Sequence, residues 1–334
     1  MKKISLLLVV VLVLVFCFAA TACSSTPPGQ QLDTDNSEED TSGDQKTAVA
    51  SDQKYALVLH TLNSSFAATI GEGAKKAGED LGVTVDVMGP TGNSSLDEQV
   101  SMIESCIAAG YDGIATVVWD EDGFTGTIEK AHAAGIPVIA CNQDSDTSGA
   151  DAFVGQALEE SGYVLGKYMF GDVMGGSGKY IIGSLDPAQT ALVLRIDGIK
   201  RAQEEFPDVE LVDVIDYTDD LTQSYSIIEN AYLANPDVKA FLGTDFNAEA
   251  IGTFIETNNL QGKLFGGGYD LTEGIIKHLN AGTLAVTINQ EPFYQGYYPI
   301  IQLHMMNTTP YKAMDMITEA ALVTPENVGD YPVQ

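Results

Sequence analysis

The chain has 334 residues, 45% of them hydrophobic, and its 47 acidic residues far outnumber its 16 basic ones. This length allows two domains, and the hydrophobic content is that of a globular protein. The net charge of −31 argues against a nucleic-acid partner, since binding to phosphates needs a basic surface. The acidity is instead typical of a solvated surface that keeps a protein in solution.

The first residues carry the pattern of an export signal. Two lysines precede a long apolar run that ends at Ala20, and small residues stand directly before Cys23. The run is long enough to serve alternatively as a transmembrane anchor. The cysteine after three small residues resembles the lipobox of bacterial lipoproteins. This resemblance implies a signal peptide over residues 1–22 and a lipid on Cys23, which would hold the chain outside the cytoplasmic membrane, at the cell surface or in the periplasm.

The segment 23–52 is rich in Ser, Thr, Asp, Gln and Pro and has almost no large apolar residues. Such a composition cannot bury enough surface to fold. We therefore expect a disordered tether between the membrane and the folded part.

Two cysteines, Cys106 and Cys141, remain in the part expected to fold. An extracellular pair can form a disulfide, but two cysteines on separate elements are weak evidence for one. Two buried free thiols are the favoured alternative.

The folded part opens with one strand, one polar turn and one amphipathic helix. The apolar run Tyr55–Leu59 is typical of a strand buried on both faces. After the turn 60–66, apolar residues recur at helical spacing as far as Leu81, and Gly82 ends the helix as a C-cap.

The alternation of strands and helices then continues, which indicates parallel sheets. Strands are expected at 83–88, 113–118, 137–141, 179–184, 210–216, 240–244, 263–267 and 284–288. Helices are expected at 96–109, 125–134, 159–169, 189–205, 223–234, 248–258 and 271–280. A last helix, 293–306, has no place in the second set of strands. This order predicts two similar α/β halves between which the chain crosses more than once.

Four segments stand in the order found in one family of binding proteins. They are the turn Thr61–Phe66, the run Gly135–Ile139, the triplet Gly268-Tyr269-Asp270 and the pair Asn289-Gln290. Over residues 53–323 the chain resembles type I periplasmic sugar-binding proteins, the ribose- and galactose-binding group of ABC importers.

The resemblance implies an α/β fold of two Rossmann-like lobes with parallel sheets, joined by a three-strand hinge and closing on a sugar. The implied lobes are residues 53–156 with 291–317, and residues 157–290 with 318–334. The implied partners are a monosaccharide or polyol and an ABC permease with its ATPase. The membrane would be reached only through the lipid on Cys23, and we expect a monomer.

Side chains at the strand ends are the candidates for the sugar site. Sugar hydroxyls need carboxylates and amides, and the apolar faces of the ring need aromatic groups. The carboxyl ends of the strands, where ligands bind in open α/β sheets, offer both. The candidates are Ser64, Phe66, Trp119, Asn142, Gln143, Asp219, Asp245, Asp270 and Gln290.

Several candidates have a structural alternative. Phe66 could be an ordinary core residue, and Trp119 could lie under the cleft without contacting the sugar. Asp219 could cap the next helix together with Asp220, and Asp245 could also be an N-cap.

The other polar residues near the strand ends are expected to have different roles. Thr272 is a suitable cap for the helix after Asp270, which would leave Asp270 free for the ligand. Gln290 is expected to be buried at the hinge. His60 ends the first strand, and a hydrogen-bonded histidine behind the site is the favoured interpretation.

The chain departs from the ribose-binding pattern at the positions that carry charge. It has Asn142-Gln143 where that pattern has an Asp-Arg pair, and Val193 where it has an arginine. The only arginines, Arg195 and Arg201, fall inside one predicted helix. We therefore expect no basic group in the cleft and, in place of ribose, another neutral sugar or polyol.

An enzyme is disfavoured by the motifs. The segment Gly175–Lys179 looks like a P-loop, but it lacks the first glycine and precedes a strand instead of following one. The sequence has no nucleophile elbow and no zinc-protease motif, and we expect no cofactor and no metal. Two binding alternatives stay open: a receptor that presents its ligand to a membrane sensor, and a binder of a nucleoside or furanose signal.

Overall fold

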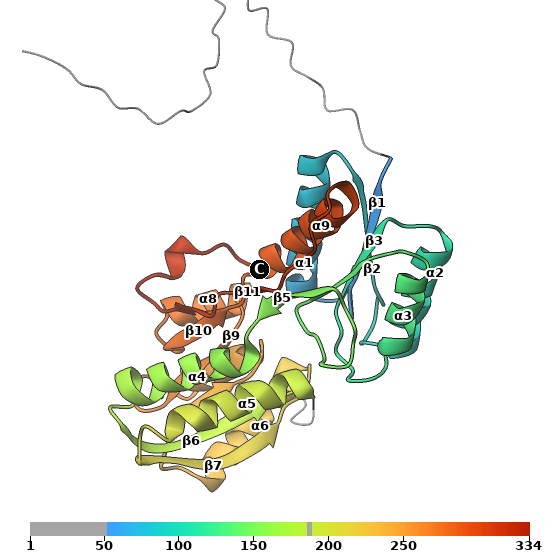
Figure 1. Ribbon diagram of the computed structural model, residues 1–334. Coiled ribbons are helices and arrows are strands. Elements are labelled where there is room, and N and C mark those ends of the chain that lie inside the picture. The colour runs from blue at the N-terminus through green and yellow to red at the C-terminus, as the bar shows by residue number, and fades with distance from the viewer. Residues whose placement is uncertain (1–51, 186–188) are drawn as a thin grey trace, which may run out of the picture. The chain divides into compact units, whose positions relative to one another are not determined.

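The structure is a computed structural model that describes residues 52–185 and 189–334 (Figure 1). The predicted signal peptide, Cys23 and all of the predicted tether except Asp52 lie outside the described residues. The described residues form two α/β lobes, each built around a six-stranded sheet. The predicted fold class is therefore confirmed.

The two sheets have the same topology, in which the first strand of each lobe lies between the second and the third. From edge to edge, the first sheet holds β11 (Met316–Thr318), β5 (Ala152–Gln156), β4 (Val138–Cys141), β3 (Gly113–Thr116), β1 (Lys54–Val58) and β2 (Thr84–Met88). The second holds β12 (Ala321–Val323), β10 (Val286–Asn289), β9 (Phe265–Tyr269), β8 (Val238–Gly243), β6 (Ser177–Ser184) and β7 (Asp208–Asp216). Among the described strands all pairs are parallel except β10 with β12.

Helices cover both faces of each sheet (Figure 1). The first sheet packs against α1 (Ser65–Leu81) and α9 (Pro292–Thr308) on one face and α2 (Leu96–Ala108) and α3 (Thr125–Ala133) on the other. The second packs against α4 (Leu158–Tyr168) and α5 (Thr190–Gln203) on one face and α6 (Leu221–Ala234), α7 (Ala248–Thr257) and α8 (Glu273–Asn280) on the other. A π-helical turn (Met169–Val173) extends α4, and a 3₁₀ turn (Val328–Asp330) follows β12.

The chain crosses between the lobes three times. It leaves the first sheet after β5, returns to the first lobe after β10 through α9, and reaches the second sheet again between β11 and β12. The helix that had no place in the second set of strands is α9, which packs on α1. The local sequence pattern did not predict β5, β11 and β12 as strands, although the resemblance implied strands at the hinge. β11 and β12 have only three residues each, too few to show a period in the sequence.

The first strand and helix show how the local sequence sets this fold. Tyr55 and Leu57 of β1 are fully buried, because helices cover both faces of the sheet. The Ser64 hydroxyl accepts a hydrogen bond from the backbone N–H of Ala67 at 3.1 Å and so caps α1. Gly82 ends the helix at a φ of 68°, a left-handed conformation that glycine adopts at little cost.

Close helix crossings through glycine occur in each lobe. In the first lobe, a Cβ on Gly73 of α1 would lie 1.9 Å from the carbonyl oxygen of Phe293 in α9. In the second, a Cβ on Gly162 of α4 would lie 2.1 Å from the carbonyl oxygen of Arg195 in α5. Both distances are far inside van der Waals contact, so a larger residue would force the helices apart.

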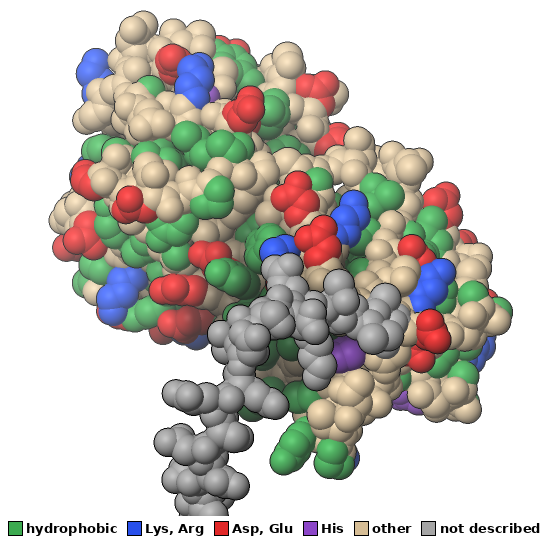
Figure 2. Space-filling model, turned by 90° about the horizontal axis from the view of Figure 1, so that it is seen from above, with side chains coloured by type: hydrophobic (Ala, Val, Ile, Leu, Met, Phe, Trp, Pro, Cys, Tyr) green, Lys and Arg blue, Asp and Glu red, His purple; other side chains and the backbone are tan. Residues whose placement is uncertain are grey.

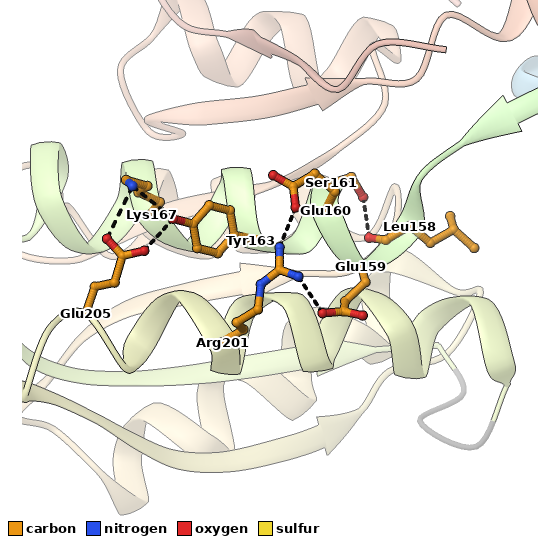
Figure 3. Close-up of polar contacts among 8 residues, drawn as sticks. All are labelled: Leu158, Glu159, Glu160, Ser161, Tyr163, Lys167, Arg201 and Glu205. Atoms are coloured by element: carbon orange, nitrogen blue, oxygen red, sulfur yellow. Dashed lines mark hydrogen bonds and ion pairs between the residues drawn. The ribbon is translucent and has the colours of Figure 1, made fainter. Parts of the chain in front are cut away.

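Exposed charges line the contact between α4 and α5 (Figure 3). Arg201 of α5 lies between two carboxylates of α4, with Nη1 at 2.6 Å from Oε1 of Glu159 and Nη2 against Glu160. Lys167 of α4 reaches Glu205 at 3.2 Å. Exposed pairs of this kind contribute little to stability, because water and salt screen the charges. Figure 2 shows that acidic side chains are spread over the visible face, as expected of a solvated surface.

Cys106 and Cys141 are both buried free thiols in the structure, so the disulfide alternative is wrong. Burial raises the pKa of the Cys106 thiol to about 11 and that of Cys141 further. Within residues 52–185 and 189–334, none of the helices combines the length and hydrophobicity needed to span a bilayer.

Candidate ligand cleft

A cavity of about 510 Å³ lies where side chains from the strand ends of both lobes meet. The structure places eight of the nine candidate residues on its wall. They are Ser64, Phe66, Asn142, Gln143, Asp219, Asp245, Asp270 and Gln290. The size is within the range of small-molecule sites.

Trp119 is the candidate that does not line the cavity. Its indole N–H donates to Oε1 of Gln99 at 2.8 Å, and its ring packs edge-on against Phe124. Gln99 in turn donates to the carbonyl oxygen of Val117 at 2.8 Å. A buried glutamine on α2 therefore holds the partly buried tryptophan against the core of the first lobe. This arrangement favours the alternative in which Trp119 does not contact the sugar, and a ligand contact for Trp119 stays a prediction.

The wall contributed by the first lobe is uncharged. Asn142 adopts a left-handed conformation with a φ of 65° directly after β4, and its Nδ2 donates to Oε1 of Gln295 at 3.1 Å. Gln143 donates to Oδ1 of Asn142 at 3.5 Å. Phe66 is partly buried and combines the two roles expected of it, since it packs on the core and also reaches the cavity.

His60 also lines this wall, and no hydrogen-bonded partner holds it from behind. Its Nδ1 is buried and has no hydrogen-bond partner in the structure, which differs from the favoured interpretation of the sequence. Burial lowers the pKa of His60 to about 4, because an enclosed imidazolium would lose its hydration. The ring is therefore neutral at physiological pH.

Arg195 lies on the wall of the second lobe, contrary to the expectation that the cleft holds no basic group. Side chains in a helix point toward its N-terminus, and Arg195 is in the second turn of α5, which starts near the cleft. Its Nη1 donates to the carbonyl oxygen of Thr244 at 2.7 Å, and its guanidinium stacks on the ring of Tyr269 with 4.0 Å to the ring centre. Only 6% of the residue is exposed, and its Nε has no partner.

Gln290 connects this arginine to Asp270. Nη2 of Arg195 donates to Oε1 of Gln290 at 2.5 Å, and Nε2 of Gln290 donates to Oδ1 of Asp270 at 2.5 Å. Asp270 adopts a left-handed conformation with a φ of 73°, which is costly for a residue with a side chain and typical of functional sites. Thr272 caps α8 by accepting from the N–H of Ile275, so Asp270 is free of that role.

The other two aspartates of this wall differ in how much they are already bonded. Asp245 accepts from the backbone N–H groups of Asn247 at 2.8 Å and of Leu185 at 3.0 Å. Asp219 is exposed, while its neighbour Asp220 caps α6 by accepting from Thr222 and Gln223. The capping alternative therefore applies to Asp220.

Burial changes the acidity of the enclosed carboxyls. It raises the pKa of Asp245 to about 6, although the backbone donors oppose the shift. It also raises the pKa of Asp270, and there the positive charge of Arg195 and the hydrogen bond from Gln290 act in the opposite direction. Among the described residues no group of three His, Cys, Asp or Glu side chains is arranged to hold a metal ion.

Comparison with known proteins identifies the family. Residues 55–307 match the model of the periplasmic binding protein domain. The chain is 27% identical over 261 residues to the xylose/arabinose-binding protein XylF of Sulfolobus acidocaldarius, covering 72% of this chain and 64% of that protein. It is 23% identical over 278 residues to the ribose import binding protein RbsB of Bacillus subtilis, covering 82% of this chain and 85% of that one.

A solved structure is also similar. The ABC transporter solute-binding protein of Burkholderia graminis in complex with D-arabinose superposes with a TM-score of 0.79 at 25% identity, covering 84% of this chain and 98% of that one. These relatives are binding proteins and not enzymes, so the enzyme alternative is excluded. The resemblance to type I periplasmic sugar-binding proteins is thereby confirmed, and the chain belongs to the periplasmic binding protein family.

Proposed function

We propose that the protein is the extracytoplasmic solute-binding subunit of an ABC importer and captures a neutral monosaccharide or polyol between its lobes. The observation that carries this proposal is the cavity wall itself. Amide groups, hydroxyls and carboxylates from both lobes surround one space, with Phe66 available to contact an apolar ring face. The names of its relatives, which include xylose, arabinose and ribose, support a sugar.

The charge balance of the wall favours a neutral ligand. Asp219, Asp245 and Asp270 face a single guanidinium, and that guanidinium is already engaged by Thr244 and Gln290. An anion would have to compete with three carboxylates for it, and burying an unpaired charge costs several kcal/mol. Sugar hydroxyls, in contrast, can donate to the carboxylates in charge-assisted hydrogen bonds.

Closure of the lobes is part of the same proposal. The sugar would stabilise the closed arrangement by bonding to both walls at once, and the permease would recognise that arrangement. The lobe boundaries predicted from the sequence, 53–156 with 291–317 and 157–290 with 318–334, are the units we propose to move. The protein is proposed to act as a monomer.

The lipid anchor is proposed from the sequence alone. Replacement Cys23→Ala should abolish lipid attachment and leave the precursor unprocessed, while sugar binding stays unchanged. Metabolic labelling with palmitate tests this directly. Equal label in the variant and the wild type would remove the anchor from the account.

Thermal-shift screening tests the ligand class. A ligand that binds only the folded state raises the melting temperature. The panel holds D-xylose, L-arabinose, D-arabinose, D-ribose, D-allose, xylitol and ribitol, and we expect at least one of them to raise the melting temperature in proportion to the logarithm of its concentration. No shift with any neutral sugar or polyol of a wider panel would contradict the proposal.

A further inference from the structure

Gln295 is a buried residue that does not line the cavity but contacts both the wall of the first lobe and the hinge. It lies in the first turns of α9, directly after the second crossing, and none of its surface is exposed. Its Oε1 accepts from Nδ2 of Asn142 at 3.1 Å. Its Nε2 donates to the carbonyl oxygen of Gln290 at 2.7 Å and to Oγ1 of Thr318 at 3.3 Å.

The orientation of this amide follows from its partners. A backbone carbonyl can only accept, so the nitrogen of Gln295 has to face Gln290 and the oxygen has to face Asn142. Thr318 strengthens the same point, because its hydroxyl donates to the Gln290 carbonyl at 3.0 Å. One side chain thus joins the end of β4, the second crossing and the third crossing.

The hydrogen bonds of Gln295 continue on both sides into the cleft. Asn142 lines the wall of the first lobe. Gln290 uses its side chain to bond Arg195 and Asp270 on the wall of the second lobe. Hydrogen bonds linked through the backbone and side chain of Gln290 therefore connect one wall, through the hinge, to the other.

We propose that Gln295 is a positioning residue that couples the two walls of the cleft across the hinge and thereby sets the affinity for the ligand. The inference rests on the proposed function, since it assumes a ligand held by both walls. Loss of the amide would leave Nδ2 of Asn142 without a partner and the Gln290 carbonyl with only the Thr318 hydroxyl. Each residue could then adopt a geometry that no longer matches the bound ligand. The residue acts through its neighbours and does not contact the ligand itself.

The same helix offers a matched control. Gln302 lies seven residues further along α9 and is 5% exposed, its Oε1 accepts from the backbone N–H of Met314 at 2.8 Å, and its Nε2 has no partner among the described residues. It therefore makes no hydrogen bond to Asn142, Gln290 or Thr318. Gln295→Met and Gln302→Met each replace a buried amide of α9 by an apolar side chain of similar length. Both should lower the melting temperature of the ligand-free protein.

Calorimetric titration separates the two variants. The probe is the neutral sugar of the thermal-shift panel that raises the wild-type melting temperature most. Gln295→Met should bind it about tenfold more weakly, the scale of one lost buried hydrogen bond, and Gln302→Met should bind it as the wild type does. Equal affinity in Gln295→Met and wild type, or equal weakening in both variants, would overturn the inference while leaving the proposed function in place. Absence of wild-type binding to every sugar would overturn both.

A second variant guards against misfolding and probes the direction of the bond. Gln295→Glu keeps the acceptor for Asn142 but, when ionised, cannot donate to Gln290. Burial raises the pKa of such a carboxyl, so the acid form, which can donate, should be recovered as the pH falls from about 8 to about 5. The ratio of variant to wild-type affinity should rise over this range and stay flat for Gln295→Met. A flat ratio for Gln295→Glu would contradict the donor role.

Discussion

The two walls of the cleft differ in charge. The wall of the first lobe is uncharged, and its polar groups include a neutral His60 whose Nδ1 has no partner. The wall of the second lobe carries one guanidinium and three carboxylates, and Arg195, Gln290 and Asp270 are bonded to one another before any ligand is present. These charged groups therefore lose most of their hydration during folding. Less desolvation free energy remains to be lost when a ligand displaces water from the cleft.

The comparison suggests that the second lobe provides most of the binding energy and the first lobe completes the enclosure. Charged groups held in a water-poor site make stronger hydrogen bonds than neutral ones. Uncharged amides are cheaper to leave partly solvated while the cleft is open. Variants on the second wall should therefore have larger effects than variants on the first.

The largest effect is expected from Arg195→Met. Removing the guanidinium leaves Asp270 buried without its counter-charge, which should lower the free energy of unfolding by about 3–5 kcal/mol and abolish sugar binding. The matched control is Arg201→Met, because Arg201 makes only exposed ion pairs with Glu159 and Glu160, so its loss should change stability little and leave sugar binding unchanged. Denaturant unfolding and calorimetric titration measure both quantities. Wild-type affinity in Arg195→Met would refute the ordering of the two walls.

Acid should affect the two walls in opposite senses. Asp245 has a folded-state pKa raised to about 6, so its contribution to stability is fully present below its unfolded value of 3.8 and is lost as the pH rises through 6. His60 has a folded-state pKa lowered to about 4, so its contribution is present above 6.5 and is lost as the pH falls through 4. Each contribution amounts to about 3 kcal/mol.

Unfolding of the ligand-free protein between about pH 4 and pH 7 tests these signs. In the wild type, protonation of Asp245 stabilises the folded state as the pH falls, so Asp245→Asn, which lacks this effect, should lose more stability in acid than the wild type. Protonation of His60 destabilises the folded state as the pH falls, so His60→Phe should lose less stability in acid than the wild type. Parallel pH profiles for both variants and the wild type would show that neither group is perturbed by burial.

Asp270→Ala and Gln290→Ala should each weaken sugar binding by about 1–3 kcal/mol, the scale for leaving a buried partner unpaired. Asp219→Ala is the comparison on the same wall, and its effect should be smaller because Asp219 is exposed. Calorimetric titration with the best sugar of the panel measures all three. Unchanged affinity in Asp270→Ala and Gln290→Ala would mean that the ligand binds elsewhere.

The smallest effect is expected for helix caps, one on each wall. Ser64→Ala and Thr272→Ala each remove a side-chain oxygen that accepts from a backbone N–H at 3.1 Å, at the start of α1 and α8. Ser64→Ala should lower the free energy of unfolding by about 1 kcal/mol. Thr272→Ala should lower it slightly more, because the Thr272 hydroxyl also donates to Oε2 of Glu249 at 2.9 Å. Thermal and denaturant unfolding compare them. A loss several times larger in one variant would show that its hydroxyl has a role beyond capping.

The parts of the site that could be predicted from the sequence are those fixed by strand order. Asn142, Asp245 and Asp270 follow parallel strands, and because the carboxyl ends of such strands meet at one edge, residues far apart in the sequence arrive at one cavity. The same logic predicted the two lobes and the crossings between them. The apolar runs and helix caps, read in chain order, were sufficient to predict the two lobes and more than one crossing between them.

The parts that could not be predicted depend on side-chain direction and on pairing across the fold. Arg195 reaches the cleft because helical side chains point toward the N-terminus, and a position inside a predicted helix does not reveal this. Trp119 packs on the first lobe because Gln99, on a helix whose predicted bounds did not reveal this contact, accepts from its indole. Gln295 could have been suspected only as an amide at a helix start, since two of its three partners, Asn142 and Thr318, come from distant segments.

A cleft with one charged and one neutral wall should admit a neutral sugar and reject an anionic one. The most direct measurement is calorimetric titration of the wild-type protein with matched pairs, such as D-ribose with D-ribose 5-phosphate and D-glucose with D-glucuronate. Wherever the neutral member of a pair binds, the anionic member should bind at least about 100-fold more weakly, because it would bring an unpaired charge to the three carboxylates. Tighter binding of a phosphorylated or acidic sugar than of its neutral partner would contradict the account and would mean that Arg195 is free to pair with the ligand.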